Sequence, residues 1–170
     1  MLKEIELKKV SLDPLKIIDQ DWTLVTASKD NKVNTMTASR GAIGEIWFKP
    51  VSFIFIRQSR YTKEFLDAQD YYSLSFFDGK YKKEMAYLGS HSGRDEDKIK
   101  KVNGKISYFE NVPYFSNASL VLICKKMYAQ KMEEDCFFDK KAYEETYEKD
   151  YSDIHTMYIG EIVKVLKDEE

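Results

Sequence analysis

The chain has 170 residues, of which 33% are charged and 43% hydrophobic, and its formal net charge is −2. This composition excludes a disordered chain, and the charge provides no basic field that would recruit nucleic acid or an acidic membrane surface. No run approaches the roughly 18 apolar residues of a membrane-spanning helix, and the first residues lack the apolar stretch of a secretion signal. We therefore predict one cytoplasmic domain over residues 1–170, with neither nucleic acid nor membrane as a partner.

The first third of the chain predicts mostly strands. Its elements, in order, are a lead-in over residues 1–20, a hairpin of strands 22–28 and 33–39, a flexible link at 41–44 and a strand over 51–57. The last of these is apolar on both faces, so we expect it to be a central strand.

The remainder mixes short helices with strands. We predict helices over 62–69, 80–88 and 96–101, a polar loop at 90–95, strands over 71–77, 106–109, 112–115, 120–128 and 156–166, and an acidic excursion over 133–153 that is helical at 142–147. Gly160 inside the closing strand predicts a bulge or a close approach. Six or seven strands with a few short helices predict a mainly β (α+β) fold, a barrel with helical excursions.

The two cysteines do not predict a disulfide framework or a zinc site. No histidine lies at ligand spacing from Cys124 or Cys136. Cys124 falls within an apolar strand pattern, so we expect a small buried side chain. The sequence predicts no metal site.

Two separated stretches predict a site for an anion. The predicted strand over 33–39 carries an amide and three hydroxyls, at Asn34, Thr35, Thr37 and Ser39. The strand over 51–57 ends in Arg57, followed by two hydroxyls and a helix. Backbone N–H groups at a helix N-terminus and a bidentate guanidinium are typical phosphate ligands. The alternatives are an ordinary strand end and a surface salt bridge at Arg57.

Other features also have ordinary alternatives. The loop at 90–95 is either part of a ligand site or a polar turn, and His155 is either catalytic or a structural side chain with satisfied hydrogen bonds. Trp47 could stack on a cofactor, but a plug at the barrel end is favoured. The Tyr-rich segment 133–153 is a solvated excursion or a dimer contact.

The sequence resembles the flavin reductase-like family of homodimeric, FMN-binding split β-barrels, which includes flavoredoxins and the flavin reductases of two-component monooxygenases. The resemblance covers about residues 10–165. It is found in stretches that occur in the family's order, at 21–27, 34–39, 49–62, 92–98 and 155–162.

The resemblance implies a flavin site. It implies that FMN is bound along the flavin edge by Asn34, Thr35, Met36, Thr37, Ala38 and Ser39, at the phosphate by Arg57, Ser59, Tyr61 and Thr62, and in a closing loop by Ser90, Ser92, Arg94 and Lys98. His155 becomes the catalytic candidate, near the nicotinamide or the reactive face of the flavin. Arg40 stands where relatives often have a large aromatic residue, and its charge would raise the reduction potential or attract an anionic partner.

The function that the resemblance implies is an NAD(P)H:flavin oxidoreductase, in which bound FMN receives hydride and passes electrons to free flavin, oxygen, a metal complex or a partner protein. No Gly-x-Gly-x-x-Gly turn follows a strand, so NAD(P)H would be a transient co-substrate. The alternatives are an FMN electron carrier with little NAD(P)H activity and a split barrel for another phosphorylated or haem ligand. We expect a homodimer. The nicotinamide preference, the electron acceptor and whether FMN stays bound are left open.

Overall fold

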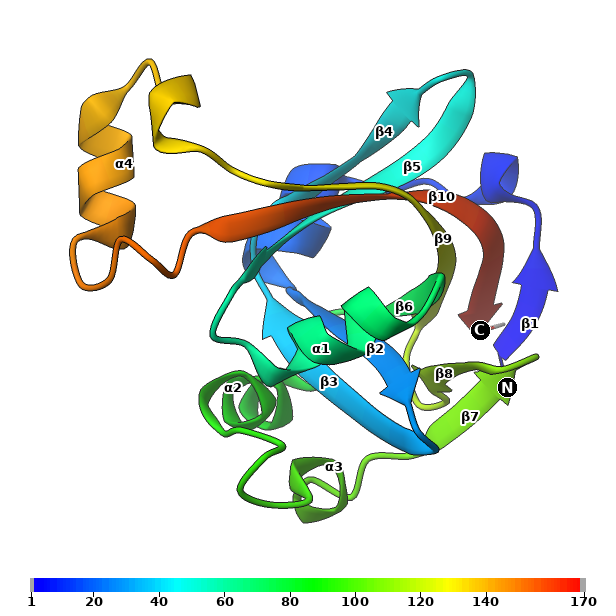
Figure 1. Cartoon of the computed structure of the whole chain (residues 1–170). Coiled ribbons are helices and arrows are strands. Elements are labelled where there is room, and N and C mark those ends of the chain that lie inside the picture. The colour runs from blue at the N-terminus through cyan, green and yellow to red at the C-terminus, as the bar shows by residue number, and fades with distance from the viewer. Residues whose placement is uncertain (1, 169–170) are drawn as a thin grey trace.

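A strongly curved antiparallel sheet forms the centre of the protein (Figure 1), which the computed structural model describes over residues 2–168. Over these residues its strands are β1 (Leu2–Ile5), β2 (Thr23–Lys29), β3 (Lys32–Ala38), β4 (Gly41–Ile46), β5 (Lys49–Arg57), β6 (Tyr71–Phe76), β9 (Leu120–Lys131) and β10 (His155–Asp168). The strand order is β3-β2-β6-β9-β10-β5-β4, and β1 also pairs with β10. A separate hairpin consists of β7 (Ile106–Phe109) and β8 (Val112–Phe115).

The helices are short and lie outside the sheet. They are α1 (Tyr61–Ala68), α2 (Lys82–Ser90), α3 (Lys98–Lys101) and α4 (Lys140–Tyr147), with 3-10 turns at Leu7–Lys9 and Glu134–Cys136 and a π-helical turn at Lys16–Gln20. In α1 the buried residues Thr62, Phe65 and Leu66 recur at helical spacing. The predicted mainly β fold with short helices is confirmed.

The apolar core fills the inside of the curved sheet. The strands contribute side chains that alternate between its two faces, and Val25, Ile56 and Leu122 are fully buried in one cluster. A second cluster packs α2 and β8 against the sheet through Met85 and Phe115. Each such side chain contributes about 1.5–3 kcal/mol on burial.

Gly160 lies at a bulge in β10 and leaves room for the side chain of Tyr72. The register of β10 with β9 shifts between Ile159 and Gly160, as a bulge requires. A Cβ atom at Gly160 would lie only 2.3 Å from the Tyr72 hydroxyl, which bonds to Ser52 Oγ at 2.8 Å. The predicted bulge is confirmed, and so is the burial of Cys124 beside this network.

The β4–β5 hairpin corrects two predictions. Residues 41–44 are not a flexible link, because they pair with β5 as the first part of β4. Trp47 does not plug the barrel: it lies at the hairpin tip, 48% exposed, beside the fully exposed Phe48. Both residues have positive φ angles, as a two-residue turn of this kind requires.

Residues 132–154, which we call the arm, extend away from the sheet between β9 and β10 (Figure 1). Tyr143, Tyr147 and Ile154 are buried together there, with Met132 and Phe137 packed against them. The arm therefore has a small apolar core of its own, and its helix α4 begins two residues earlier than the sequence predicts.

Candidate functional site

Two adjoining cavities open where β3 ends. The first, the arginine cavity, has a volume of about 400 Å³ and is lined by Met36, Thr37, Ala38, Ser39, Arg40, Phe55, Arg57, Arg60, Glu145, Thr146 and His155. The second, the hydroxyl cavity, has a volume of about 130 Å³ and is lined by Asn34, Met36, Ser59, Arg60, Tyr61, Thr62, Ser90, His91, Ser92 and Lys98. Met36 and Arg60 line both cavities, so the two cavities are neighbours.

Side-chain hydrogen bonds connect β3 to the start of α1 and to α2. The Asn34 amide donates a hydrogen bond to Thr62 Oγ1 at 2.9 Å, and the Thr37 hydroxyl donates to the Met85 carbonyl at 2.5 Å. Thr35 points the other way: it is fully buried, and its hydroxyl bonds to the Val25 carbonyl at 3.0 Å. Thr35 is thus the one member of the predicted 34–39 set, within the described chain, that lines neither cavity.

The N-terminus of α1 lies at the hydroxyl cavity without a side-chain cap. Its N-cap residue, Arg60, makes no side-chain hydrogen bond to the first turn; its guanidinium instead donates to the Gly89 carbonyl at 2.9 Å. The first N–H groups of a helix have no partner inside the helix, so they are available to an anion. Arg60 was not predicted as a site residue, although it is the second arginine shortly before the predicted helix.

Lys98 contributes a buried charge to the same cavity. Only 4% of its surface is exposed, and its ammonium donates to the carbonyls of Leu88 at 2.6 Å and His91 at 2.9 Å. Burial, with the nearby Arg60 charge, lowers the pKa of Lys98 to about 8. An ammonium has three donors, so one remains for a ligand.

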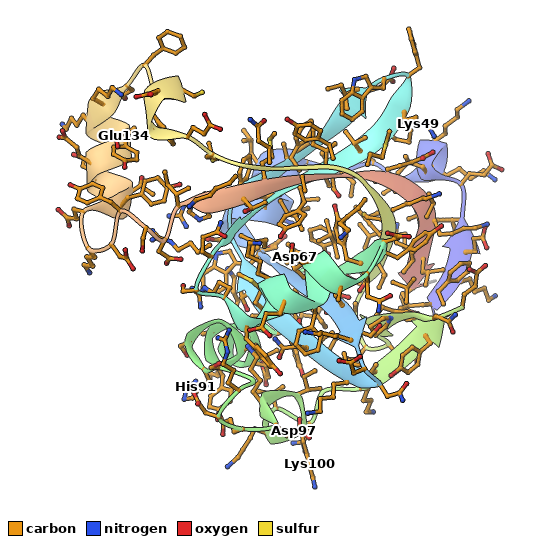
Figure 2. The ribbon with its side chains drawn as sticks, in the orientation of Figure 1. Lys49, Asp67, His91, Asp97, Lys100 and Glu134 are labelled. Atoms are coloured by element: carbon orange, nitrogen blue, oxygen red, sulfur yellow. The ribbon has the colours of Figure 1, made fainter. Side chains whose placement is uncertain are left out.

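The polar loop after α2 and the arm reach the site from different sides. Figure 2 shows His91 and Asp97 beside α2 and α3, well apart from Glu134 on the arm. Three residues of the predicted closing loop line the hydroxyl cavity: Ser90 at the end of α2, Ser92 after it and Lys98 in α3. The arm contributes Glu145 and Thr146 to the arginine cavity, which no sequence pattern indicated.

Arg94 lines neither cavity. Its guanidinium bonds to Glu64 Oε1 at 2.5 Å and to the Ser59 carbonyl at 3.3 Å, and it stacks over the Tyr61 ring at 4.7 Å. These contacts fasten the loop to α1. In this structure Arg94 therefore connects the two segments that line the hydroxyl cavity.

Arg57 and Ser59 are tied to the arm by Asp153. The Ser59 N–H and hydroxyl donate to the Asp153 carboxylate at 2.7 and 2.9 Å, and the Arg57 guanidinium lies 3.5 Å from the same carboxylate. Arg57 also donates to the Thr146 carbonyl at 2.8 Å. It lines the arginine cavity, whereas the other predicted phosphate ligands, including Ser59, line the hydroxyl cavity. The structure brings Thr37 and Arg57 to one cavity but separates Arg57 from the hydroxyl set.

His155 is the first residue of β10 and pairs with Arg57 in β5. Its Nδ1 atom lies 2.6 Å from the hydroxyl of Tyr147. Burial, together with the adjacent Arg57 charge, lowers the pKa of His155 to about 4. His155 is therefore neutral at neutral pH.

The arginine cavity is positively charged. Three guanidinium groups, those of Arg40, Arg57 and Arg60, line it, against the single carboxylate of Glu145. Arg40 is exposed and bonds to the neighbouring Ser39 hydroxyl at 3.1 Å. Such a field favours a ligand that is anionic or gains electrons.

Over residues 2–168, no group of three or more His, Cys, Asp or Glu side chains has an arrangement that could hold a metal ion. In the same range no helix has the length and apolar character required to cross a membrane.

The family model described as "Flavin reductase like domain" matches residues 16–170. A flavoredoxin from Methanosarcina acetivorans is 20% identical, with a TM-score of 0.69, over 88% of this chain and 69% of that one. An FMN-binding domain of a flavin reductases-like enzyme from Shewanella baltica OS155 is 16% identical, with a TM-score of 0.70, over 99% and 78%.

An NADH:FAD oxidoreductase from Streptomyces globisporus C-1027 is 15% identical, with a TM-score of 0.66, over 87% of this chain and 75% of that one. A comparison with curated proteins found no match. At these identities the structural likeness establishes the fold, and the predicted split-barrel class is confirmed.

Proposed function

The chain belongs to the flavin reductase-like family, and from this premise we propose that it is an FMN-dependent oxidoreductase that accepts hydride from NAD(P)H. Electrons then pass to free flavin, another small acceptor or a partner protein. The hydroxyl cavity binds the phosphate end of FMN, and the arginine cavity binds its ring.

The observation that carries this proposal is the donor set of the hydroxyl cavity. An uncapped helix N-terminus, the buried Lys98 ammonium and several hydroxyls all line one small space. Helix N–H groups and a cation are the ligands a dianionic phosphate requires. The residues present therefore fit the phosphate of FMN.

The arginine cavity suits the other end of the same ligand. Bound flavin supplies the redox chemistry itself. The residues of this chain orient it and stabilise charge: Arg40 and Arg57 provide a positive field, and neutral His155 provides a hydrogen-bonding group at the cavity wall. Glu145 and Thr146 from the arm line one side of the cavity.

The test combines binding with reduction. Purified protein is titrated with FMN while flavin fluorescence is followed, and the FMN-loaded protein is then mixed anaerobically with NADH or NADPH. We expect saturable binding of one FMN per chain and loss of the yellow absorbance with at least one nicotinamide. Failure to bind FMN would contradict the proposed function.

A second candidate function is an FMN electron carrier. Two of the similar structures are described as flavoredoxins, and this sequence has no dinucleotide-binding glycine motif. A carrier would bind FMN equally well but would keep its yellow absorbance with both nicotinamides. The anaerobic experiment therefore separates the two candidates.

We also propose that the protein is a homodimer in which the arm lies in the interface. Phe138 at the arm is fully exposed, and Tyr151 is more than half exposed. A protruding segment with large exposed aromatic side chains is typical of a surface that is covered in an assembly.

A further inference from the structure

The hydroxyl of Tyr147 is buried against His155. Tyr147 belongs to α4 in the arm and is 3% exposed. Its hydroxyl lies 2.6 Å from His155 Nδ1, and the two rings meet edge to face with centroids 5.5 Å apart. The Arg57 guanidinium lies over the tyrosine ring, 5.3 Å from its centroid. The tyrosine is thus held in place on several sides.

The direction of the hydrogen bond follows from a second contact. The backbone N–H of His155 donates to the same tyrosine oxygen, at 3.5 Å. If Nδ1 were protonated, the tyrosine oxygen would accept two hydrogen bonds and its own proton would have no acceptor among the described residues, which would leave a buried donor unsatisfied. Donation from Tyr147 to Nδ1 satisfies both groups, and it places the proton of the neutral ring on Nε2. Nε2 makes no hydrogen bond to another described residue. Because His155 lines the arginine cavity, this N–H group is available to a ligand there.

The charges around the ring keep it neutral. His155 is surrounded by Arg57 from β5, Arg40 after β3 and Arg60 before α1, with Asp153 as the opposing carboxylate. Burial and the three cations act in the same direction, so the neutral ring is maintained down to acidic pH.

We propose that Tyr147 is a positioning residue that fixes His155 as the Nε2–H tautomer, so that the histidine serves the arginine cavity as a neutral hydrogen-bond donor. The role of that donor toward a bound flavin rests on the proposed function. His155 would then donate a hydrogen bond to an acceptor atom of the ring system without giving up its proton. This role differs from the proton transfer usually expected of a catalytic histidine.

The tautomer can be measured directly in the free protein. The chain has only two histidines, His91 and His155, so a correlation spectrum of protein labelled with ¹⁵N-histidine contains two ring systems, which His91→Asn assigns. We expect His155 to show a protonated Nε2 and an unprotonated Nδ1 at pH 7. A protonated Nδ1 in the unaltered protein would overturn the proposal, whether or not any variant folds.

The matched pair of variants is Tyr147→Phe and Tyr143→Phe. Both tyrosines are buried in α4, but the Tyr143 hydroxyl bonds to Glu134 Oε2 at 3.2 Å instead of to a histidine. We expect a mixture of tautomers in Tyr147→Phe, a rise in the pKa of His155 there, and no change in Tyr143→Phe. The same tautomer in all three proteins would contradict a positioning role.

Flavin measurements separate this inference from the proposed function. In Tyr147→Phe we expect FMN affinity to change less than about threefold, while the rate of flavin reduction falls about fivefold, as the loss of one neutral hydrogen bond allows. An unchanged rate would overturn the role toward flavin. If the unaltered protein binds no FMN, the proposed function fails, and the spectrum still decides the tautomer.

Discussion

Lys98 shows at the scale of one residue how burial prepares a site for an anion. Its ammonium is removed from water and contacts only backbone carbonyls within the described chain. A bound phosphate would add a negative charge to that of the nearby Glu96 carboxylate, so the free energy of desolvation would be further offset in the complex.

Lys98→Met keeps the length of the side chain and removes the charge. We expect FMN affinity to fall about tenfold or more, since a hydrogen bond to a charged group contributes about 1.5–3 kcal/mol. Binding is measured by fluorescence titration, with riboflavin as the control ligand because it lacks the phosphate. An equal loss for riboflavin would contradict the assignment of Lys98 to the phosphate.

In the unaltered protein FMN affinity should also fall as pH rises above about 8, where Lys98 of the ligand-free protein loses its proton.

The lowered pKa of His155 predicts that the free energy of unfolding depends on pH. Its pKa is about 6.5 in the unfolded chain and about 4 in the folded protein. Between these two pH values the histidine is therefore mostly protonated in the unfolded chain but mostly neutral in the folded protein. Stability should therefore decrease as pH falls from 6.5 toward 4, by at most about 1.4 kcal/mol per pH unit from this group. Urea unfolding of the unaltered protein and of His155→Gln between pH 7 and 5 measures the difference. Identical pH slopes in the two proteins would contradict the burial of a neutral histidine.

At the scale of the element, the junction between the arm and α1 has a carboxylate where the proposed ligand brings a phosphate. Asp153 accepts both the N–H and the hydroxyl of Ser59, which lines the hydroxyl cavity. Two like charges near one set of donors repel each other. The arm is therefore expected to influence flavin affinity through this contact.

Asp153→Asn tests that influence. The asparagine oxygen can still accept from Ser59, but the negative charge is gone, so we expect FMN affinity to rise severalfold. The control is Asp150→Asn, which removes the same charge from the same loop at a residue bonded to Ser152 instead. Titration with FMN compares the two. A similar change in both variants would indicate only a general field effect.

The elements also show why part of the site was predictable. The alternation in 33–39 and the apolar run ending at Arg57 are local patterns, and both appear as strands that line the site. The contacts of Arg57 with Thr146 and of Ser59 with Asp153 span 89 and 94 residues. No local pattern encodes such a meeting, so the sequence could not show that the arm engages Arg57. Residues 41–44 were mistaken for a link because their two glycines obscured a paired strand.

At the scale of the whole molecule, the proposed roles of the arm would link flavin binding to assembly. It contributes one wall of the arginine cavity through Glu145 and Thr146, and it also presents Phe138 to solvent. A partner that covers the arm would restrict its motion and thereby hold the cavity wall in place. In the proposed homodimer, flavin affinity and dimer formation are therefore linked.

Phe138→Asp tests this link because a charge cannot be buried in an apolar interface without a large penalty. We expect the unaltered protein, 20.0 kDa per chain, to sediment as a dimer, and Phe138→Asp to shift toward the monomer and bind FMN more weakly. The control is Phe48→Asp, an equally exposed phenylalanine at the β4–β5 hairpin tip, which should remain dimeric. Dissociation by Phe48→Asp alone would move the interface from the arm to the hairpin, and a flavin-loaded monomer of the unaltered protein would contradict the dimer. If Phe138→Asp is monomeric but binds FMN with unchanged affinity, the arm serves assembly alone, because its cavity wall then keeps its position without a partner.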